Sequence, residues 1–439
     1  MKDMISKIIL LSLDVMAIIM AILIGYKIRV FLGDTFTQSF GHSLPHYLGF
    51  WPLYIFPILL MAYEGIYTKR YDFWHESREV IKSLTLSFIA IMAILAMTKT
   101  IDTYSRLTIF LIFGTMGILI PLFKNIGKKL LYKVGLWRRE AFIMGGDDFI
   151  VKELYKNPYF GYIQSDNEHA KTVFINSNVF NHDQLHKIVE DEIQKRHEVI
   201  YIPMLNDYNL TQSQIYELSN THTNLIVFKN RLKSHYRQYF QQLFNYTLAL
   251  TLLPILLPLI GLFALLIKYE SPGAVFFVHN RVGKNGKTIP TLKFRSMYSN
   301  AKERLEKLLE DDPLVRQEWE MNFKLKHDPR VTKIGSFLRK TSLDELPQIF
   351  NVLKGEMNFV GPRPVIQKEI DLYYKEDAKY YYMVKPGITG LWQVSGRSDT
   401  DYDFRVATDK WYVANWSLWL DIVILLKTVK TVLKRDGAY

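Results

Sequence analysis

The sequence predicts a membrane protein of the α plus α/β class, and three patterns lead to this prediction. Four apolar stretches fill the first part of the chain, each about twenty residues long, which is the length that an α-helix needs to cross a bilayer. Short β-type runs then alternate with helical runs between residues 139 and 230. A further apolar run, interrupted by two prolines, precedes a C-terminal part in which basic residues recur beside glycine and proline.

Composition limits the classes of protein that the chain can belong to. Its 439 residues have room for two or three domains, and 49% hydrophobic residues exclude a disordered chain. The formal charge of +12 indicates attraction to anions, which include nucleic acid, anionic lipid and phosphorylated substrates. The chain has no cysteine, so disulfides and cysteine-based zinc or iron–sulfur sites are excluded, and any metal must bind oxygen or imidazole.

The four apolar stretches predict four transmembrane helices within a domain of residues 1–130. Four successive runs separated by polar breaks favour membrane spans over buried core helices. The first run contains Asp14 and is followed by further spans, which argues against a cleaved signal peptide. The stretches lie near residues 8–26, 48–66, 83–101 and 106–124.

The positions of lysine and arginine predict the orientation of these helices. Segments rich in these residues stay in the cytoplasm. They stand at the N-terminus, between the second and third stretches, and after the fourth: Lys2, Lys7, Lys69, Arg70, Arg78, Lys82 and residues 124–139. The chain after Arg139 is therefore expected to begin on the cytoplasmic face.

Residues 139–230 predict a nucleotide-fold-like, that is Rossmann-like, domain with a parallel sheet. Gly145 and Gly146 follow its first β-type run, but the G-x-G-x-x-G fingerprint of dinucleotide binding is absent. A structural or regulatory role is therefore favoured over cofactor binding. The β-type runs lie at residues 141–144, 172–175, 199–203 and 225–228, with helices expected between them.

The apolar run at residues 248–267 contains Pro254 and Pro258. Proline inside a helix removes a backbone hydrogen bond and bends the helix. Both flanks of the run are basic and prefer the cytoplasm, which favours a re-entrant helix over residues 246–268. A proline-kinked helix that crosses the membrane is the alternative.

The last part of the chain holds basic residues suited to phosphate binding. Arginine offers a bidentate fork and lysine a compact charge, and neighbouring glycine or proline fixes the local backbone. The primary candidates for phosphate contacts are Lys293, Arg295, Arg330 and Arg363, with Arg281 and Arg397 as secondary candidates.

The pair Asp344 and Glu345 is the candidate catalytic centre. Pro347 fits best in the first turn of a helix, so the helix is expected to begin close to Asp344. Adjacent carboxylates can divide the work, one attacking phosphorus and one binding Mg²⁺. A structural alternative makes Asp344 a helix N-cap, or pairs Ser342 with Glu345 in a capping box.

Taken together, these motifs resemble the bacterial sugar transferase family, the monotopic polyprenyl-phosphate phosphoglycosyltransferases, from Gln241 to Tyr439. The front of the chain resembles the large form of this family, and the C-terminal end resembles its galactose-transferring members. The likeness rests on Phe276 to Gly283, Lys293 to Met297, Asp328-Pro329-Arg330, Leu343-Asp344-Glu345-Leu346-Pro347-Gln348, Gly361-Pro362-Arg363-Pro364, and Lys385 to Gln393.

The resemblance implies a mostly helical monotopic catalytic domain over residues 241–439. Asp344 would form an aspartyl sugar-phosphate, Glu345 would bind Mg²⁺ beside Asp344, and the helix broken at Pro258 would be the re-entrant anchor. The apolar run from Trp416 to Val432 is too short to span and is expected to lie at the membrane interface.

The same resemblance implies transfer of hexose 1-phosphate from a UDP-sugar to undecaprenyl phosphate, with release of UMP, as the first step of O-antigen or capsule synthesis. Galactose is the expected sugar and glucose the alternative. The expected location is the bacterial cytoplasmic (inner) membrane, in contact with membrane lipid. The resemblance also allows for a homodimer and gives no role to nucleic acid.

Three residues depart from the family pattern, and two other functions compete with this one. The family usually has Gln at the position of His279, Asp at that of Asn245 and often Ser at that of Leu257.

A membrane-tethered sugar-nucleotide dehydratase or epimerase would need Tyr381 and Lys385 as a helical Tyr-x-x-x-Lys pair, which Pro386-Gly387 disfavours. A transport subunit would need charged residues within its spans, and these are scarce.

Overall fold

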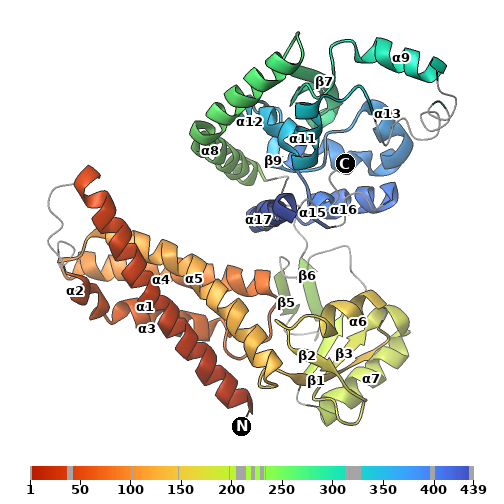
Figure 1. Ribbon diagram of the computed structural model, residues 1–439. Coiled ribbons are helices and arrows are strands. Elements are labelled where there is room, and N and C mark those ends of the chain that lie inside the picture. Colours follow the sequence, from red (N-terminus) through yellow and green to blue (C-terminus); the bar gives the residue numbers. More distant parts are fainter. Residues whose placement is uncertain are drawn as a thin grey trace. The chain divides into compact units, whose positions relative to one another are not determined.

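The computed structural model describes residues 2–36, 43–99, 103–146, 148–196, 198–203, 214–218, 223–227, 232, 234–311, 316, 328–395 and 401–434. The chain divides into two compact units, residues 1–205 and residues 206–439. Figure 1 shows the elements of each unit.

The first unit begins with a helical region. Helix α5 packs against α1 and α4, and α4 packs against α3. Among the described residues, four segments here are long and apolar enough to cross a membrane, as predicted; the second consists of α2 and α3 together. Ile18 and Ile112 are fully buried while Ile118 is 70% exposed, so apolar side chains cover the outside as well as the core. The helices are α1 (Lys2–Phe36), α2 (Leu44–Leu48), α3 (Pro52–Tyr63), α4 (Phe73–Met97) and α5 (Arg106–Lys133).

Four buried charges link the helices of this region. Lys124 on α5 lies 2.7 Å from Asp14 on α1, and Lys128 pairs with Glu76 on α4. The Tyr67 hydroxyl donates a hydrogen bond of 2.7 Å to Asp14. Isolated buried charges are costly, and pairing offsets that cost. These four charges are therefore used in contacts between helices.

A parallel four-stranded sheet completes the first unit, as the alternating pattern predicted. The strand order is β2-β1-β3-β4, and all three strand pairs are parallel. Strand β2 has only three residues, too few for a period of two to be visible in the sequence. The elements are β1 (Arg139–Met144), α6 (Asp148–Tyr155), β2 (Tyr162–Gln164), β3 (Thr172–Asn176), the short 3-10 helix η2 (Ser177–Val179), α7 (His182–Lys195) and β4 (Glu198–Ile202).

The prediction for the end of this sheet is wrong in one respect. A strand does form near residues 225–228, as β6 (Thr223–Val227), but it pairs antiparallel with β5 (Gln214–Leu218). Strand β5 therefore stands where the alternating pattern predicted a helix. Five-residue apolar runs fit a buried parallel strand and a hairpin strand equally well, and the sequence pattern does not distinguish them. The hairpin belongs to the second unit.

The rest of the second unit is mostly helical, as expected, around a small number of short strands. Strands β7 and β8 form an antiparallel hairpin, while β9 and β10 pair in parallel. The elements are α8 (His235–Glu270), β7 (Phe276–Val282), η5 (Lys284–Gly286), β8 (Thr288–Phe294), α9 (Ala301–Asp311), α11 (Lys333–Thr341), η6 (Leu343–Gln348), α12 (Ile349–Leu353), β9 (Asn358–Val360), α13 (Gln367–Glu369), η7 (Ile370–Tyr374), η8 (Lys375–Asp377), α14 (Ala378–Tyr382), β10 (Gly387–Thr389), α15 (Leu391–Ser395), α16 (Tyr402–Ala414) and α17 (Leu418–Lys434).

Helix α8 contains both prolines of the interrupted apolar run and contacts other elements of the second unit before and after them. The Asn245 side chain accepts a hydrogen bond of 2.7 Å from the backbone N–H of Phe359. At the C-terminal end of the helix, Glu270 accepts hydrogen bonds from the backbone N–H groups of Lys333 and Ile334. Figure 1 shows the helix bent along its length. It is also long and apolar enough to cross a membrane.

Helix α17 is tied to α16 and α8 through one buried carboxyl group. Asp421 accepts hydrogen bonds from Tyr412 at 2.7 Å and from Trp416 at 3.0 Å, and Gln241 on α8 approaches it at 3.5 Å. Burial raises the pKa of Asp421 to about 7. This contact fixes α17 beside the N-terminal part of α8.

Candidate active site

Asp344 and Glu345 lie in the 3-10 helix η6, which begins at Leu343 as Pro347 predicted. Ser342 separates this helix from α11 and adopts a left-handed backbone conformation with φ of 56°. Its side chain makes no capping hydrogen bond. The structural alternative of an Asp344 N-cap or a Ser342–Glu345 capping box is therefore wrong, and both carboxylates are available for other contacts.

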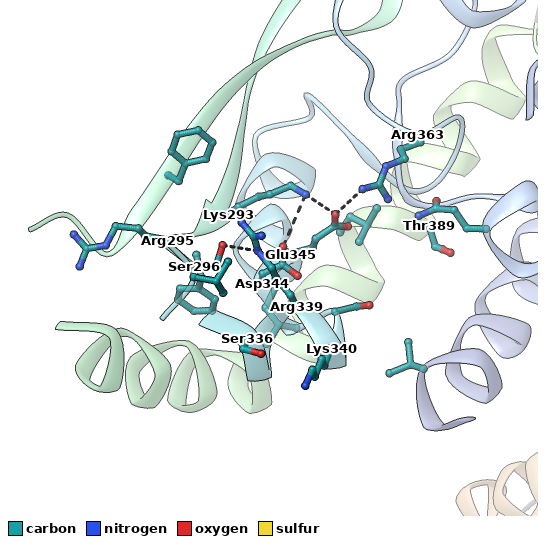
Figure 2. Close-up of a pocket in the computed structure, with 18 of the residues that line it drawn as sticks. Lys293, Arg295, Ser296, Ser336, Arg339, Lys340, Asp344, Glu345, Arg363 and Thr389 are labelled. Atoms are coloured by element: carbon teal, nitrogen blue, oxygen red, sulfur yellow. Dashed lines mark hydrogen bonds and ion pairs between the residues drawn. The ribbon is translucent and has the colours of Figure 1, made fainter. Parts of the chain in front are cut away.

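Two cationic side chains converge on Glu345. Its Oε1 atom lies 2.6 Å from Nζ of Lys293 and 3.3 Å from Nη2 of Arg363. Figure 2 shows Lys293 and Arg363 reaching this carboxylate from different segments of the chain. The same Lys293 Nζ lies 4.0 Å from Oδ2 of Asp344. Among the described residues, no group hydrogen-bonds the Asp344 side chain.

The two carboxyl groups have pKa values shifted in opposite directions. Burial raises the pKa of Asp344, and the negative charge of Glu345 adds to the rise, against the opposing effect of Lys293. Burial also disfavours the charge of Glu345, but Arg363 and Lys293 outweigh it and hold its pKa below the usual range. The pKa of Glu345 is thus lower than that of Asp344, so Asp344 is the more basic member of the pair. The two residues are equipped for different roles.

Close backbone packing places the segment that follows β8 against α11. A Cβ atom on Gly335 would lie 2.0 Å from the carbonyl oxygen of Ser296, so only glycine fits here. The contact brings Nε of Arg339, one turn further along α11, within 2.8 Å of the Ser296 hydroxyl. Arg339 thereby lies beside Asp344 (Figure 2).

The carboxylate pair lies in a cavity of about 2210 Å³. One part of its lining is charged, with Lys293, Arg339 and Arg363 around Asp344. A smaller hollow of about 390 Å³ also has Arg363 in its wall. A cationic lining around a carboxylate pair suits a substrate that carries phosphate groups.

The structure separates the predicted arginines into different roles. Arg363 reaches the carboxylate pair, and Arg281 pairs with Glu369 at 3.2 Å in the wall of both hollows. His279, a departure from the family pattern, places Nδ1 3.2 Å from Nη2 of Arg281. Burial, then Arg281, lowers the pKa of His279, so the neutral ring can accept at this atom. Arg397 lies outside the described residues.

Two further predicted arginines have backbone or local partners. Arg295 donates to the carbonyl groups of Ser271 and Pro272, and Figure 2 shows its guanidinium pointing away from Asp344. Arg330 binds Asp328 through Nε and Nη2 at 2.8 and 2.7 Å and does not line the cavity. These contacts hold the segments around the site.

Sequence reasoning did not include Lys340 and Arg405 among the candidates, and it gave Arg339 no specific role. All three line the cavity. The sequence did indicate that α11 contributes to the site. Just before Asp344, Ser336, Arg339 and Lys340 follow the i, i+3, i+4 spacing of one helix face.

The Tyr-x-x-x-Lys alternative is not supported by geometry. The Tyr381 side chain is buried, and its hydroxyl donates a hydrogen bond of 2.8 Å to the carbonyl of Val282. Helix α14 ends at Tyr382, so Lys385 lies beyond it. The pair is not a helical catalytic pair.

The adjacent carboxylates Asp344 and Glu345 are the candidate oxygen ligands for a metal, since Asp328, which also lines the cavity, is paired with Arg330. Within the described ranges, no group of three or more acidic or histidine side chains is placed to hold a metal ion. Mg²⁺ commonly binds one or two carboxylates together with substrate phosphates, so Asp344 and Glu345 fit this ion rather than a metal that needs a full protein cage.

Comparison with known proteins gives a consistent result. The bacterial sugar transferase family matches residues 236–435. An undecaprenyl-phosphate galactose phosphotransferase of Salmonella typhimurium is 37% identical over 404 residues, 85% of this chain and 84% of that protein. A UDP-galactose-lipid carrier transferase of Erwinia amylovora is 36% identical over 405 residues, again 85% of this chain and 84% of that protein. A UDP-glucose:undecaprenyl-phosphate glucose-1-phosphate transferase of Escherichia coli is 43% identical over 183 residues, 40% of this chain and 36% of that protein.

Proposed function

The chain belongs to the bacterial sugar transferase family, and we propose that it transfers hexose 1-phosphate from a UDP-sugar to undecaprenyl phosphate, releasing UMP. The observation that carries the proposal is the carboxylate pair Asp344–Glu345 in a cavity lined by Lys293, Arg339 and Arg363. The cations suit a diphosphate, and the pair supplies a nucleophile that needs no general base. The reaction would begin the synthesis of a cell-surface polysaccharide such as O-antigen or capsule.

The proposed reaction has two displacements at one phosphorus atom. An oxygen of Asp344 attacks the phosphorus next to the sugar, the bond to the bridging oxygen breaks, and UMP leaves with that electron pair. A phosphate oxygen of the lipid acceptor then attacks the same phosphorus and displaces the Asp344 carboxylate, giving a lipid diphosphate sugar. Lys293 and Arg363 hold Glu345 ionised beside the reacting group.

We assign Mg²⁺ to this carboxylate pair. Glu345 would hold the ion, with Asp344 adjacent and substrate phosphates completing the ligands. When bound, Mg²⁺ would offset the repulsion between anionic groups and stabilise charge on the phosphate oxygens. Because Lys293 and Arg363 contact Oε1 of Glu345, the ion and these two cations would share one carboxylate.

Galactose is the proposed sugar. Of three relatives that match 85% of the chain, two are named for galactose and the third is named only as a sugar transferase, whereas the relative named for glucose matches 40%. The two hexoses differ only in the orientation of the C4 hydroxyl, so discrimination rests on a few hydrogen bonds.

For the membrane, we propose a four-helix transmembrane bundle and a re-entrant α8, with α17 at the interface and the catalytic unit on the cytoplasmic face of the inner membrane. Asn245 and Glu270 contact the same unit, although a straight helix between them would measure about 38 Å, more than the roughly 30 Å hydrocarbon core. A helix that crossed straight through would place these residues on opposite sides.

The resemblance also allows for a homodimer, which light scattering of the purified protein would detect.

The test is an assay of the purified protein with undecaprenyl phosphate, Mg²⁺ and four donors: UDP-galactose, UDP-glucose and their N-acetylated counterparts. We expect UMP release to be fastest with UDP-galactose and to depend on the lipid acceptor for repeated turnover. Efficient transfer only from an N-acetylated donor would exclude galactose. No UMP release from any donor would exclude the reaction class.

A further inference from the structure

The catalytic cavity has an apolar side as well as a charged side. Two helices contribute to the apolar side. Helix α8 contributes Leu252 and Leu256, which are four residues apart and so lie on one helix face. Helix α17 contributes Thr428, Val429 and Val432, again within one turn. The cavity that contains the carboxylates therefore extends to the space between α8 and α17.

The apolar side is continuous with surface that suits lipid. Val429 is 59% exposed although it lines the cavity, so this wall reaches the protein surface. On α8, Leu250 and Leu262 are also exposed, and α8 is apolar enough to lie in a membrane. The opening between these helices would therefore meet hydrocarbon rather than water.

The position of α17 is fixed relative to the catalytic segments. Its Thr428 hydroxyl lies 2.8 Å from the hydroxyl of Thr389 on β10, and Thr389 lines the cavity. Figure 2 shows Thr389 on the opposite side of the carboxylate pair from Arg295. The apolar wall is thus a built part of the site.

The cavity lining also contains an exposed cation. Lys340 lines the cavity on the same helix as Arg339, and it is exposed. Within the described ranges no carboxylate pairs with Lys340, whereas Lys293 is committed to Glu345. An anionic headgroup that enters from the lipid side can therefore pair with Lys340 without breaking an existing ion pair.

We propose that the groove between α8 and α17 holds the isoprenoid chain of the lipid acceptor, with its phosphate paired to Lys340 beside Asp344. The inference rests on the proposed function and adds to it a site for the second substrate. An amphiphile with one phosphate and a long hydrocarbon chain matches a cavity that is charged at one end and apolar at the other. The donor occupies the charged side, around Arg363, so both substrates reach the same phosphorus.

Neighbouring residues on each helix provide matched controls. On α17, Val429 lines the cavity while Leu426, 53% exposed, does not. We expect Val429→Gln to raise the KM for undecaprenyl phosphate about tenfold, the factor that corresponds to losing contact with one apolar side chain. Leu426→Gln should leave this KM unchanged. On α11, Lys340→Gln should raise the same KM, while Lys333→Gln, outside the cavity, should not.

Two further measurements distinguish the acceptor step from the donor step. Incubation with a UDP-sugar labelled in the sugar, without lipid, reports the donor step alone, and Val429→Gln should label at the wild-type rate. A short, water-soluble polyprenyl phosphate should reduce the difference between wild type and Val429→Gln, because it does not fill the groove. If Val429→Gln and Lys340→Gln both label normally and keep the wild-type KM for undecaprenyl phosphate, the groove does not bind the acceptor. The proposed function would still stand. Absence of labelling in wild type would instead overturn the proposed function.

A photoreactive polyprenyl phosphate tests the position directly in the full-length protein. We expect cross-links to peptides of α8 and α17 that excess undecaprenyl phosphate suppresses. Equal suppression by phosphatidylglycerol would show that the groove binds lipids without selectivity, which would overturn the acceptor assignment. Cross-links confined to the first 133 residues would overturn it as well.

Discussion

Lys293 donates a hydrogen bond of 2.6 Å to the carboxylate of Glu345. The same ammonium group is 4.0 Å from Asp344, which has no hydrogen-bond partner within the described ranges. A carboxylate held by a cation is a weak nucleophile, and one without a close partner keeps its oxygens free. This difference in partners leads to the first two predictions.

Asp344 and Glu345 should respond differently to replacement by the amide. We expect Asp344→Asn to abolish both turnover and covalent labelling, because an amide does not attack phosphorus here. Glu345→Gln should lower turnover but keep some labelling, and excess Mg²⁺ should restore part of it. Intact-mass analysis after incubation with UDP-sugar and no lipid measures the labelling. Near-normal turnover of Asp344→Asn would exclude the nucleophile role.

The acid side of the pH profile should follow Asp344. Its pKa is raised by burial, so the carboxylate is lost at a higher pH than for a free aspartate, and kcat/KM should fall as pH decreases through that raised pKa. The positive charge of Lys293 lowers the pKa of Asp344, so Lys293→Met should raise this pKa and move the acid limb of the profile to higher pH. Lys287→Met, on the exposed turn of the β7–β8 hairpin, is the control and should leave the limb in place. A limb that does not move in Lys293→Met would contradict the assignment.

Gly335 should tolerate no side chain. Gly335→Ala forces a Cβ atom against the Ser296 carbonyl, and overpacking of this kind costs about 1–3 kcal/mol. Because the same contact places Arg339, activity should fall together with the melting temperature. Gly261→Ala on α8 is the control, since its Cβ would meet nothing within 4 Å. Thermal unfolding and UMP release measure both effects, and a fully stable Gly335→Ala protein would disprove the packing argument.

Both flanks of α8 should lie in one compartment. Single cysteines at His235 and Lys287 should react with a membrane-impermeant reagent only after permeabilisation, which is a clean test because the native chain has no cysteine. A cysteine at Thr103, between α4 and α5, should react in intact cells. Labelling at Lys287 from outside with His235 protected would show that α8 crosses the membrane.

The Asp14–Lys124 pair should show strong coupling in a double-mutant cycle. Asp14→Asn or Lys124→Met leaves a buried charge without its partner, which typically costs about 3–5 kcal/mol. The double variant should recover much of that loss. Thermal unfolding of the full-length protein in detergent measures the cycle. Additive effects of the two substitutions would show that the pair contributes no coupling.

The sequence was most informative where a local rule determines the structure. The ring of Pro347 limits where a helix can begin, so the position of Asp344 at the start of η6 could be predicted. Length and apolarity likewise predicted the helices that could cross a membrane. The parallel sheet followed from alternating runs, except for the three-residue β2, which is too short to have a pattern.

The features that the sequence could not specify depend on contacts between separate segments. The sequence around Arg295, and Pro329 beside Arg330, did not indicate whether each guanidinium faces a substrate or a nearby acceptor. In the folded chain Arg295 binds carbonyl groups at the end of α8, and Arg330 binds Asp328. The partners of Lys124 and Lys128 are similarly far away along the chain. Local patterns contain no information on such pairings.

The paired charges among the N-terminal helices have a consequence for biogenesis. Asp14 is made long before Lys124, and Glu76 before Lys128, so α1 and α4 each carry an uncompensated acidic group until α5 has been synthesised. Because an unpaired charge is costly in hydrocarbon, α1 cannot settle in its final place as an independent segment. Emergence of α5 from the ribosome therefore completes the assembly. A chain truncated before Lys124 would lack the partners of Asp14 and Glu76, whereas a chain that extends past Lys128 contains both.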